Sequence, residues 1–184
     1  TNNSNGDTSG HADWFELSNL GNFPANLFGF RIDDSHATLS ASALVTNRTS
    51  IRPGESVVFV QNMTPQAFRD WWGTNLPAGV QVISYNGSGQ GLSGSGDDVH
   101  VWNAAATADG DQVTGVNFLI GTDGVSFGFD PTVHDQTGFY GFAPDGLSVA
   151  GINGAFVAAV GGDVGSPGTI VNLPRITSLT KTNG

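Results

Sequence analysis

The sequence predicts an all-β protein, a two-layer β-sandwich with one short helix. Short apolar runs with period-2 alternation recur along the 184 residues, separated by turn formers that include 27 Gly and 8 Pro. The acidic residues are mostly Asp, which favours turns over helices. Only one segment carries both the start and the stop signals of a helix.

About nine segments are predicted to form short strands: seven with the cores given below, and two more over 153–160 and 169–171. Residues 14–18 alternate, so Phe15 and Leu17 should share the face that points inward. Residues 56–61 are apolar on both faces, which is typical of a central strand. His100 should face solvent, opposite its two valine neighbours. The predicted strand cores are 14–18, 27–32, 56–61, 80–84, 98–102, 112–119 and 125–129. The side chains expected between the sheets are Phe15, Leu17, Phe28, Phe30, Val99 and Val101.

The helix is predicted directly after the central strand. Thr64 is a natural N-cap, Pro65 suits the first helical position, and Gly73 suits the position after the last turn. An apolar side is formed by Ala67, Phe68, Trp71 and Trp72.

The charge balance excludes two classes of partner. The chain has 16 acidic and 6 basic residues, for a net charge of −10, and Lys181 is its one lysine. Such a surface repels phosphate backbones and anionic membranes, so we expect neither nucleic-acid binding nor membrane insertion. The lack of Cys is compatible with export for a domain of this size, and no apolar run is long enough for a transmembrane helix.

We expect one domain with two flanking segments. Residues 1–12 are a polar N-terminal segment, residues 13–172 form the sandwich, and residues 173–184 are a C-terminal extension or linker. No signal peptide is recognisable, so a processed form or a fragment of a larger protein is expected. The low Lys content with many Asn, Thr, Ser and Gly is typical of secreted bacterial surface modules, which predicts an extracellular or cell-surface location.

Four motifs resemble the lamin tail domain family in its bacterial secreted form. The matching segments, in the family's order, are DWFELSN at 13–19, PGESVVFV at 53–60, GLSGSGDDVHV at 91–101, and SFG at 126–128 followed by VGSPG at 164–168. The resemblance implies an immunoglobulin-like sandwich that accompanies enzymes or anchoring regions and carries no chemistry itself.

This chain departs from the family in two places. The family has an apolar strand before the DWFELSN position, whereas Thr1 to Gly10 is polar here. The Arg that often follows SFG is replaced by Phe129. An unfilled strand position would leave unpaired backbone groups and an exposed groove of core side chains.

Catalytic motifs are weak, and we predict that the chain is not an enzyme. The four His residues lack metal-ligand spacing, and the Gly-Ser-Gly sequences at 87–89 and 94–96 lack a following helix. Glu16 is the one candidate for an acid with a raised pKa. The simpler interpretation of Glu16 is a consensus residue that bonds a neighbouring loop. No cofactor is expected.

The alternative to a chain without a cofactor is one that binds calcium. Asp109 and Asp111 place two carboxylates in one turn, and Asp97 and Asp98 were expected on the adjacent strand. The competing interpretation, which we favour, is that these Asp residues build turns through side-chain to backbone hydrogen bonds.

Two binding surfaces follow from the apolar residues. Trp14 and Trp102 occupy expected outward strand positions, and Trp71 and Trp72 lie on the helix. Exposed aromatic rings there would bind glycans, and the competing interpretation, which we favour, is that at least one ring of each pair is buried. The C-terminal residues Ile170, Val171, Ile176 and Leu179 are β-formers that could add a strand to another subunit. The sequence therefore predicts a structural or adhesive module, a subunit of a surface or matrix fibre that self-associates through strand addition. The alternative is a carbohydrate-binding module that accompanies a secreted degradative enzyme.

Overall fold

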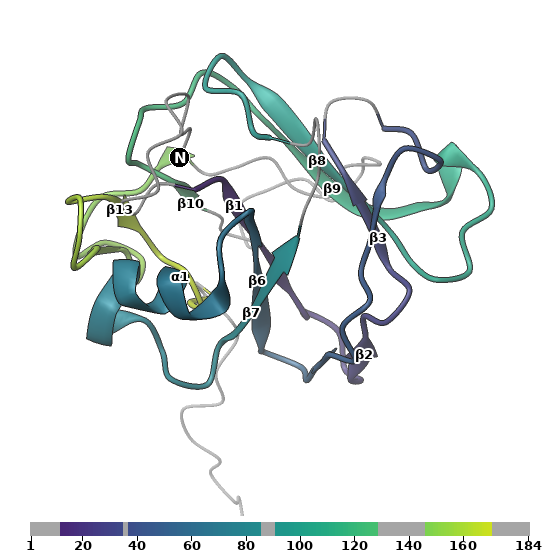
Figure 1. Ribbon diagram of the computed structural model, residues 1–184, viewed down its shortest axis with the longest axis horizontal. Coiled ribbons are helices and arrows are strands. Elements are labelled where there is room, and N and C mark those ends of the chain that lie inside the picture. Colours follow the sequence, from purple (N-terminus) through teal and green to yellow (C-terminus); the bar gives the residue numbers. More distant parts are fainter. Residues whose placement is uncertain (1–11, 35–36, 86–90, 129–145, 171–184) are drawn as a thin grey trace, which may run out of the picture.

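The computed structural model describes residues 12–34, 37–85, 91–128 and 146–170. These residues form mostly β-strands with one α-helix, which confirms the all-β class with one short helix (Figure 1). The largest sheet has the order β4 (Ala43–Leu44), β3 (Arg31–Asp33), β8 (Asp97–Trp102) and β9 (Gln112–Phe118). A second sheet has the order β1 (Trp14–Ser18), β6 (Ser56–Gln61) and β7 (Gln81–Tyr85).

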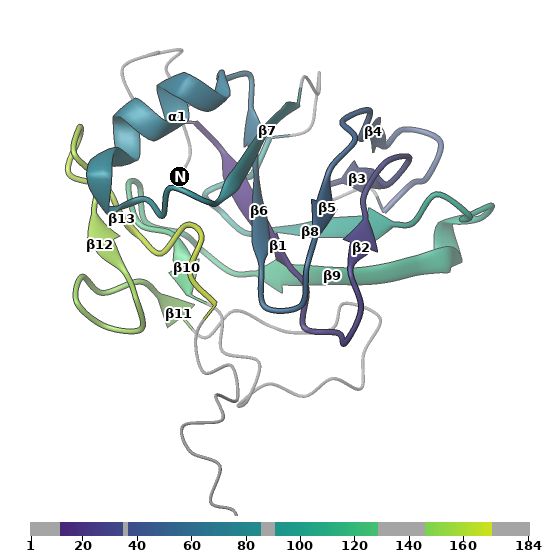
Figure 2. The same ribbon diagram turned by 90° about the horizontal axis from the view of Figure 1, so that it is seen from below.

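The remaining strands form three short antiparallel pairs. They are β2 (Ala25–Asn26) with β5 (Ser50–Ile51), β10 (Phe127–Gly128) with β11 (Gly146–Leu147), and β12 (Phe156–Val157) with β13 (Val164–Gly165). In Figure 2 the strands β10 to β13 gather at one end of the molecule, on the side of the helix. Within the described ranges, no helix is long and apolar enough to cross a membrane.

Strand β6 is the centre of its sheet, as its sequence predicts. It pairs antiparallel with β1 and parallel with β7, and five of its six residues are buried. Its side chains alternate between two cores. Val57 and Phe59 join one cluster, and Val58 and Val60 join the other. A strand that is buried on both faces needs apolar residues at every position, which this one has.

The helix α1 (Pro65–Trp72) connects β6 to β7 and has the predicted ends. The Thr64 side chain accepts a hydrogen bond from the Ala67 backbone N–H, which caps the first turn. Gly73 ends the helix with φ of 71°, a conformation that favours glycine. A short 3₁₀ turn, η1 (Gly73–Asn75), follows. The buried residues of α1 are Phe68, Trp71 and Trp72, whereas Ala67 is exposed.

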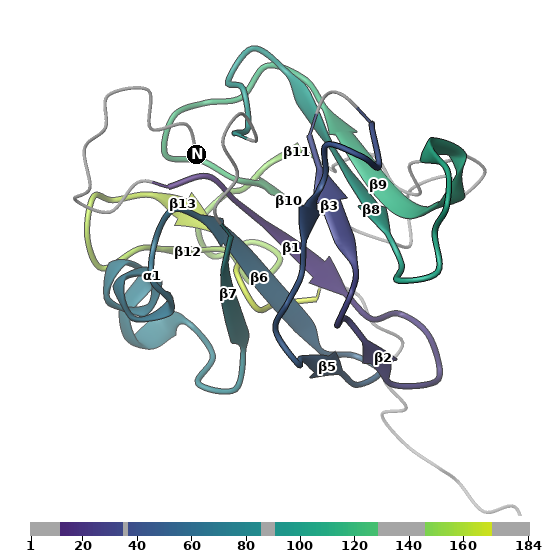
Figure 3. The same ribbon diagram turned by 45° about the vertical axis from the view of Figure 1, so that its right-hand side comes forward.

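The helix lies on the side of the β1–β6–β7 sheet away from β8 and β9 (Figure 1 and Figure 3). The sheet therefore contributes to two apolar clusters. One, between the sheet and α1, includes Trp14, Val58, Val60, Phe68, Trp71 and Trp72. The other combines residues of both large sheets. It contains five of the six side chains predicted to point between them: Phe15, Leu17, Phe30, Val99 and Val101.

Phe28 is the exception, and its predicted inward orientation is wrong. The strand predicted over 27–32 is limited to Arg31–Asp33, because Gly29 adopts φ of 85° and the chain turns there. Phe28 is 47% exposed, and the Arg48 guanidinium lies 5.2 Å from its ring centroid. The alternation of side chains between the two faces of β3 does not extend to residues before the turn, so it does not fix where Phe28 points.

The other strand boundaries differ by small amounts. The strands predicted at 14–18 and 56–61 are observed with those bounds. The strand predicted at 80–84 begins one residue later, and β8 and β9 match their predicted cores to within one residue. The strand predicted at 125–129 is described only at Phe127–Gly128. The connection between β8 and β9 ends in the 3₁₀ turn η2 (Asp109–Asp111).

Candidate functional site

Strand β1 is paired along one side only among the described residues. It pairs with β6 so that Phe15 lies opposite Phe59 and Leu17 lies opposite Val57. In an antiparallel pair, alternate residues direct their backbone groups toward the partner. Hydrogen bonds join Gln61 N to Asp13 O at 2.9 Å and Asn19 N to Glu55 O at 2.9 Å. The odd-numbered residues 13 to 19 therefore bond to β6. The backbone N–H and C=O groups that point away from β6 belong to Trp14, Glu16 and Ser18.

A cavity of about 390 Å³ lies at this unpaired side of β1. All five residues of β1 line it, and they point to opposite faces of the sheet. A cavity that meets both faces of a strand must lie at the strand's edge, where the backbone groups point. We call this cavity the β1 groove. Its main walls are Trp14 to Ser18 of β1, Thr114 to Val116 and Phe118 of β9, and Phe127 and Gly128 of β10. Leu92, which precedes β8, and Ser166 and Ile170, which follow β13, complete them.

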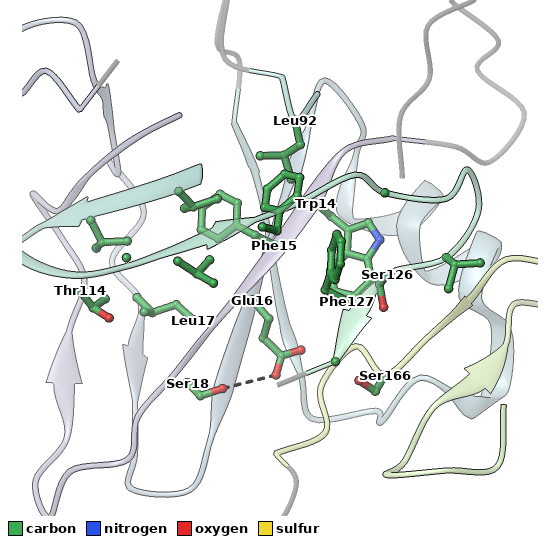
Figure 4. Close-up of a pocket in the computed structure, with 18 of the residues that line it drawn as sticks. Trp14, Phe15, Glu16, Leu17, Ser18, Leu92, Thr114, Ser126, Phe127 and Ser166 are labelled. Atoms are coloured by element: carbon green, nitrogen blue, oxygen red, sulfur yellow. Dashed lines mark hydrogen bonds between the residues drawn. The ribbon is translucent and has the colours of Figure 1, made fainter. Parts of the chain in front are cut away.

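The walls of the β1 groove are mainly apolar and come from distant parts of the chain. Figure 4 shows Leu17 on one side of β1 and the Phe127 ring with Glu16 on the other. The rings of Phe118 and Phe127 pack 5.3 Å apart, which joins the β9 wall to the β10 wall. The volume falls within the range of ordinary ligand pockets, from about 300 to 1,000 Å³. The geometry supports binding of an apolar partner with backbone polar groups.

Glu16 is the ionisable group at the centre of this edge. Its carboxylate accepts hydrogen bonds from the Gly168 backbone N–H and from the hydroxyls of Ser18 and Ser56. Burial raises its pKa from 4.5 to about 7 because the charged form loses water, and this outweighs the three hydrogen bonds that favour the charge. The interpretation of Glu16 as a residue that bonds a neighbouring loop fits these contacts. It fastens the segment that contains Gly168 to β1.

The raised pKa of Glu16 predicts that the fold loses stability as pH rises. The folded state holds a proton on Glu16 that the unfolded chain releases between about pH 4.5 and pH 7, so the free energy of unfolding falls across that interval. A pKa shift of this size would change the free energy of unfolding by roughly 3 kcal/mol for a group fully enclosed by protein. We expect a change of about 1 kcal/mol, because the groove is open to water. Burial is the main cause that raises the pKa of Asp13 to about 6, so Asp13 also makes the free energy of unfolding fall as pH rises.

Urea unfolding at pH 5 and pH 8 measures this effect. We expect Glu16→Gln to show a smaller loss of stability between the two pH values than the parent chain, because glutamine still accepts a bond but does not ionise. Asp13→Asn is the matched variant for the second group. Equal pH slopes in the parent and Glu16→Gln would contradict the assignment.

The two carboxylates considered for calcium already accept backbone hydrogen bonds, Asp111 within its own turn and Asp109 from a segment distant in the sequence. Asp111 Oδ2 accepts hydrogen bonds from the backbone N–H groups of Thr107 and Ala108, at 2.7 and 3.0 Å, and these bonds lower its pKa. Asp109 Oδ1 accepts a bond from Leu39 N at 2.8 Å. Across the described ranges, no group of three or more His, Cys, Asp or Glu side chains is arranged to hold a metal ion. The calcium hypothesis at Asp109 and Asp111 gains no support from this geometry.

The expected outward orientation of Trp14 and Trp102 is wrong. Trp14 is 9% exposed, because α1 covers the outer face of β1 and places Trp72 at 5.6 Å from the Trp14 ring. Trp102 is fully buried, and its indole N–H donates to Asp109 O at 2.9 Å, so the connection after β8 lies over it. Rings in these positions cannot form an exposed aromatic strip for a glycan.

His100 is also buried, contrary to its expected solvent orientation. Its Nδ1 lies 2.9 Å from Gln112 Oε1, and its Nε2 lies 3.0 Å from Asp98 Oδ1. Strand β8 lies between β3 and β9, and both of its faces are covered, which its alternating sequence does not reveal. Asp97 accepts a bond from Ser93 N at 2.8 Å and so also stabilises a turn.

The C-terminal interaction residues are described only in part. Ile170 lines the β1 groove. Val171, Ile176 and Leu179 lie outside the described residues, as do residues 1–11 of the predicted segment 1–12 and the whole predicted segment 173–184. The unfilled strand position implied by the family resemblance depends on residues 1–10, which also lie outside the described ranges. Sequence reasoning did not identify the far wall of the β1 groove, since Phe127 and Ser166 carry no local pattern that assigns them to it.

Comparisons with known proteins add no family assignment. No protein-family model matches this chain, and no curated protein matches it. The lamin-tail resemblance therefore remains a prediction carried by the four motifs.

Proposed function

We propose that this chain is a non-catalytic, extracellular structural or adhesive module of the lamin-tail type, with an immunoglobulin-like sandwich. In this proposal it is a subunit of a surface or matrix fibre, and it joins other chains by accepting a β-strand at β1. The observation that carries the proposal is the β1 groove. The edge of β1 that has no strand partner among the described residues lies beside an apolar cavity, and so offers backbone hydrogen bonds for affinity and side-chain pockets for specificity.

The contacts of the carboxylates support the non-catalytic part of the proposal. Glu16 is held by three donors, and Asp109 and Asp111 bond backbone N–H groups in turns. A catalytic acid needs a carboxylate that is free to reach a substrate. The burial of Trp14 and Trp102 removes the main support for the carbohydrate-binding alternative.

The self-association of the full chain tests the proposal. The mass of the parent chain, measured by sedimentation over a wide concentration range, should rise with concentration. Ser18→Pro should abolish this rise, because the Ser18 N–H points away from β6 and proline removes it without breaking the β1–β6 pair. Ser18→Ala, which keeps the N–H and loses only the hydroxyl, is the matched control and should assemble like the parent.

A second variant guards against misfolding of Ser18→Pro. Thr114→Arg places a long charged side chain in the groove from β9 and leaves β1 unchanged. It should also prevent assembly, with an unchanged circular dichroism spectrum. A parent chain that stays monomeric throughout, or variants that assemble like it, would refute the proposed function.

A further inference from the structure

We infer that the strand accepted at the β1 groove is the chain's own C-terminal segment, residues 171–184, donated by a second copy. This inference rests on the proposed function, because a module that joins chains must exchange the segment between copies. It goes further by naming the occupant. Four features of the described residues and the sequence support this choice.

The segment begins at the groove. Ile170 lines the groove wall, and the Gly168 N–H is bonded to the Glu16 carboxylate at the edge of β1. Fourteen residues follow Ile170, whereas β1 has five. At about 3.3 Å per residue, seven residues suffice to pair along β1, and the others can span to a neighbouring copy. The contacts at Gly168 and Ile170 would remain in each copy while the segment beyond them enters the next one.

The side chains of the segment match the two-sided groove. Pro174 lacks an N–H and suits the start of an edge strand, so pairing would begin at Arg175. Ile176 and Leu179 differ by three positions and therefore point to opposite faces of a strand. The groove has apolar walls on both faces of β1, with Leu17 on one and Phe127 on the other. One apolar side chain would be buried on each.

The charges are complementary. Glu16 and Asp123 line the groove, and its described lining includes no basic residue. The segment carries Arg175 and Lys181 and has no acidic residue, in a chain of net charge −10. A basic strand beside an acidic edge is favoured by local attraction, although whole copies of net charge −10 repel one another at a distance.

The other two long stretches outside the described residues fit less well. Residues 1–11 include no apolar side chain to fill an apolar groove. Residues 129–145 are fixed at both ends, because Gly128 pairs with Gly146 in the β10–β11 pair. A stretch whose two ends are both held by pairing within one chain is poorly placed to pair as a strand with another copy. Residues 171–184 have the apolar and basic composition that the groove requires, and no described strand pairs after Val164–Gly165 to hold their far end.

Disulfide trapping in the full chain tests the inference, since the chain has no cysteine of its own. One variant carries Ser18→Cys at the β1 edge. The other carries either Thr177→Cys or Ser178→Cys, because neighbouring residues of a strand point to opposite faces. Mixed under mild oxidation, the two variants should form a mixed disulfide dimer with one of the two positions. Thr74→Cys, an exposed site on η1 away from the groove, replaces Ser18→Cys in the matched control.

We expect the Ser18→Cys mixture to cross-link at least tenfold faster than the Thr74→Cys mixture, and an excess of free peptide 171–184 to suppress that reaction. A chain with both Ser18 and the segment residue changed to Cys should give a ladder of covalent oligomers. Equal cross-linking in the two mixtures, or closure of the double variant within a single chain, would overturn the inference. If the parent chain still assembles in that case, the proposed function stands. If the parent never assembles, both fail.

Discussion

Trp72→Ala is expected to remove about 3–5 kcal/mol from the free energy of unfolding, a large part of the roughly 5–15 kcal/mol of a typical domain. Trp72 is fully buried, and its ring centroid lies 5.6 Å from Trp14, 5.2 Å from Trp71 and 5.4 Å from Phe156. It thus joins α1 to β1 and to β12. Truncation to alanine removes these contacts and leaves a cavity that the surrounding sheet and helix cannot fill.

Urea unfolding followed by circular dichroism measures the loss. Trp72→Phe is an informative intermediate, because the Trp72 indole N–H has no hydrogen-bond partner among the described residues. Phenylalanine removes that buried polar group along with part of the ring, so we expect a loss of only about 1–2 kcal/mol. Gln66→Ala, on the exposed side of α1, is the control and should change little. A loss below about 1 kcal/mol for Trp72→Ala would show that the cluster does not hold the fold together.

The sequence predicted elements whose signals are local. The helix carries its own cap at Thr64, its proline at Pro65 and its terminating Gly73, so its bounds could be derived without any tertiary information. The strand at 14–18 has the predicted bounds, and the strand at 56–61 has an apolar pattern that matches its burial on both faces. The all-β class followed from the same patterns.

The wrong predictions concern strand faces that another segment of the chain covers. Trp14, His100 and Trp102 were expected in solvent because alternation places them opposite the inter-sheet core. The helix α1 covers Trp14, and the connection after β8 covers Trp102, so both faces are buried. Alternation gives two faces but does not show whether the second face is covered by a segment distant in the sequence.

The candidate site was predictable only in outline. The lamin-tail resemblance, with the polar stretch Thr1 to Gly10, implied an unfilled strand position in the sheet, and Glu16 was predicted only as a candidate acid on the strand at 14–18. The cavity walls combine β9, β10 and the segment near Gly168, which are brought together only by the fold. The turn at Gly29, which exposes Phe28, depends on a backbone conformation that a pattern of apolar residues does not report.

The bond between Trp71 and Asp163 is expected to contribute the second large effect. The Trp71 indole N–H donates to Asp163 Oδ2 at 2.7 Å, and Asp163 is only 3% exposed. The same residue accepts a backbone bond from Ala158 N at 2.7 Å, and Val160 N donates to Trp71 O at 3.1 Å. Trp71 and Asp163 therefore fasten the β12–β13 pair to α1. The segment with Gly168, which borders the β1 groove, follows directly after that pair.

Asp163→Ala should reduce the free energy of unfolding by about 2–3 kcal/mol, because it leaves the buried Trp71 N–H without its carboxylate acceptor. Asp163→Asn keeps an oxygen acceptor and should lose less. Trp71→Phe removes the donor, and in the double variant Trp71→Phe with Asp163→Ala the two losses should overlap, giving a coupling energy of about 1–3 kcal/mol. Urea unfolding of the four chains completes this cycle. Additive losses would mean that the side-chain hydrogen bond between Trp71 and Asp163 contributes nothing to stability.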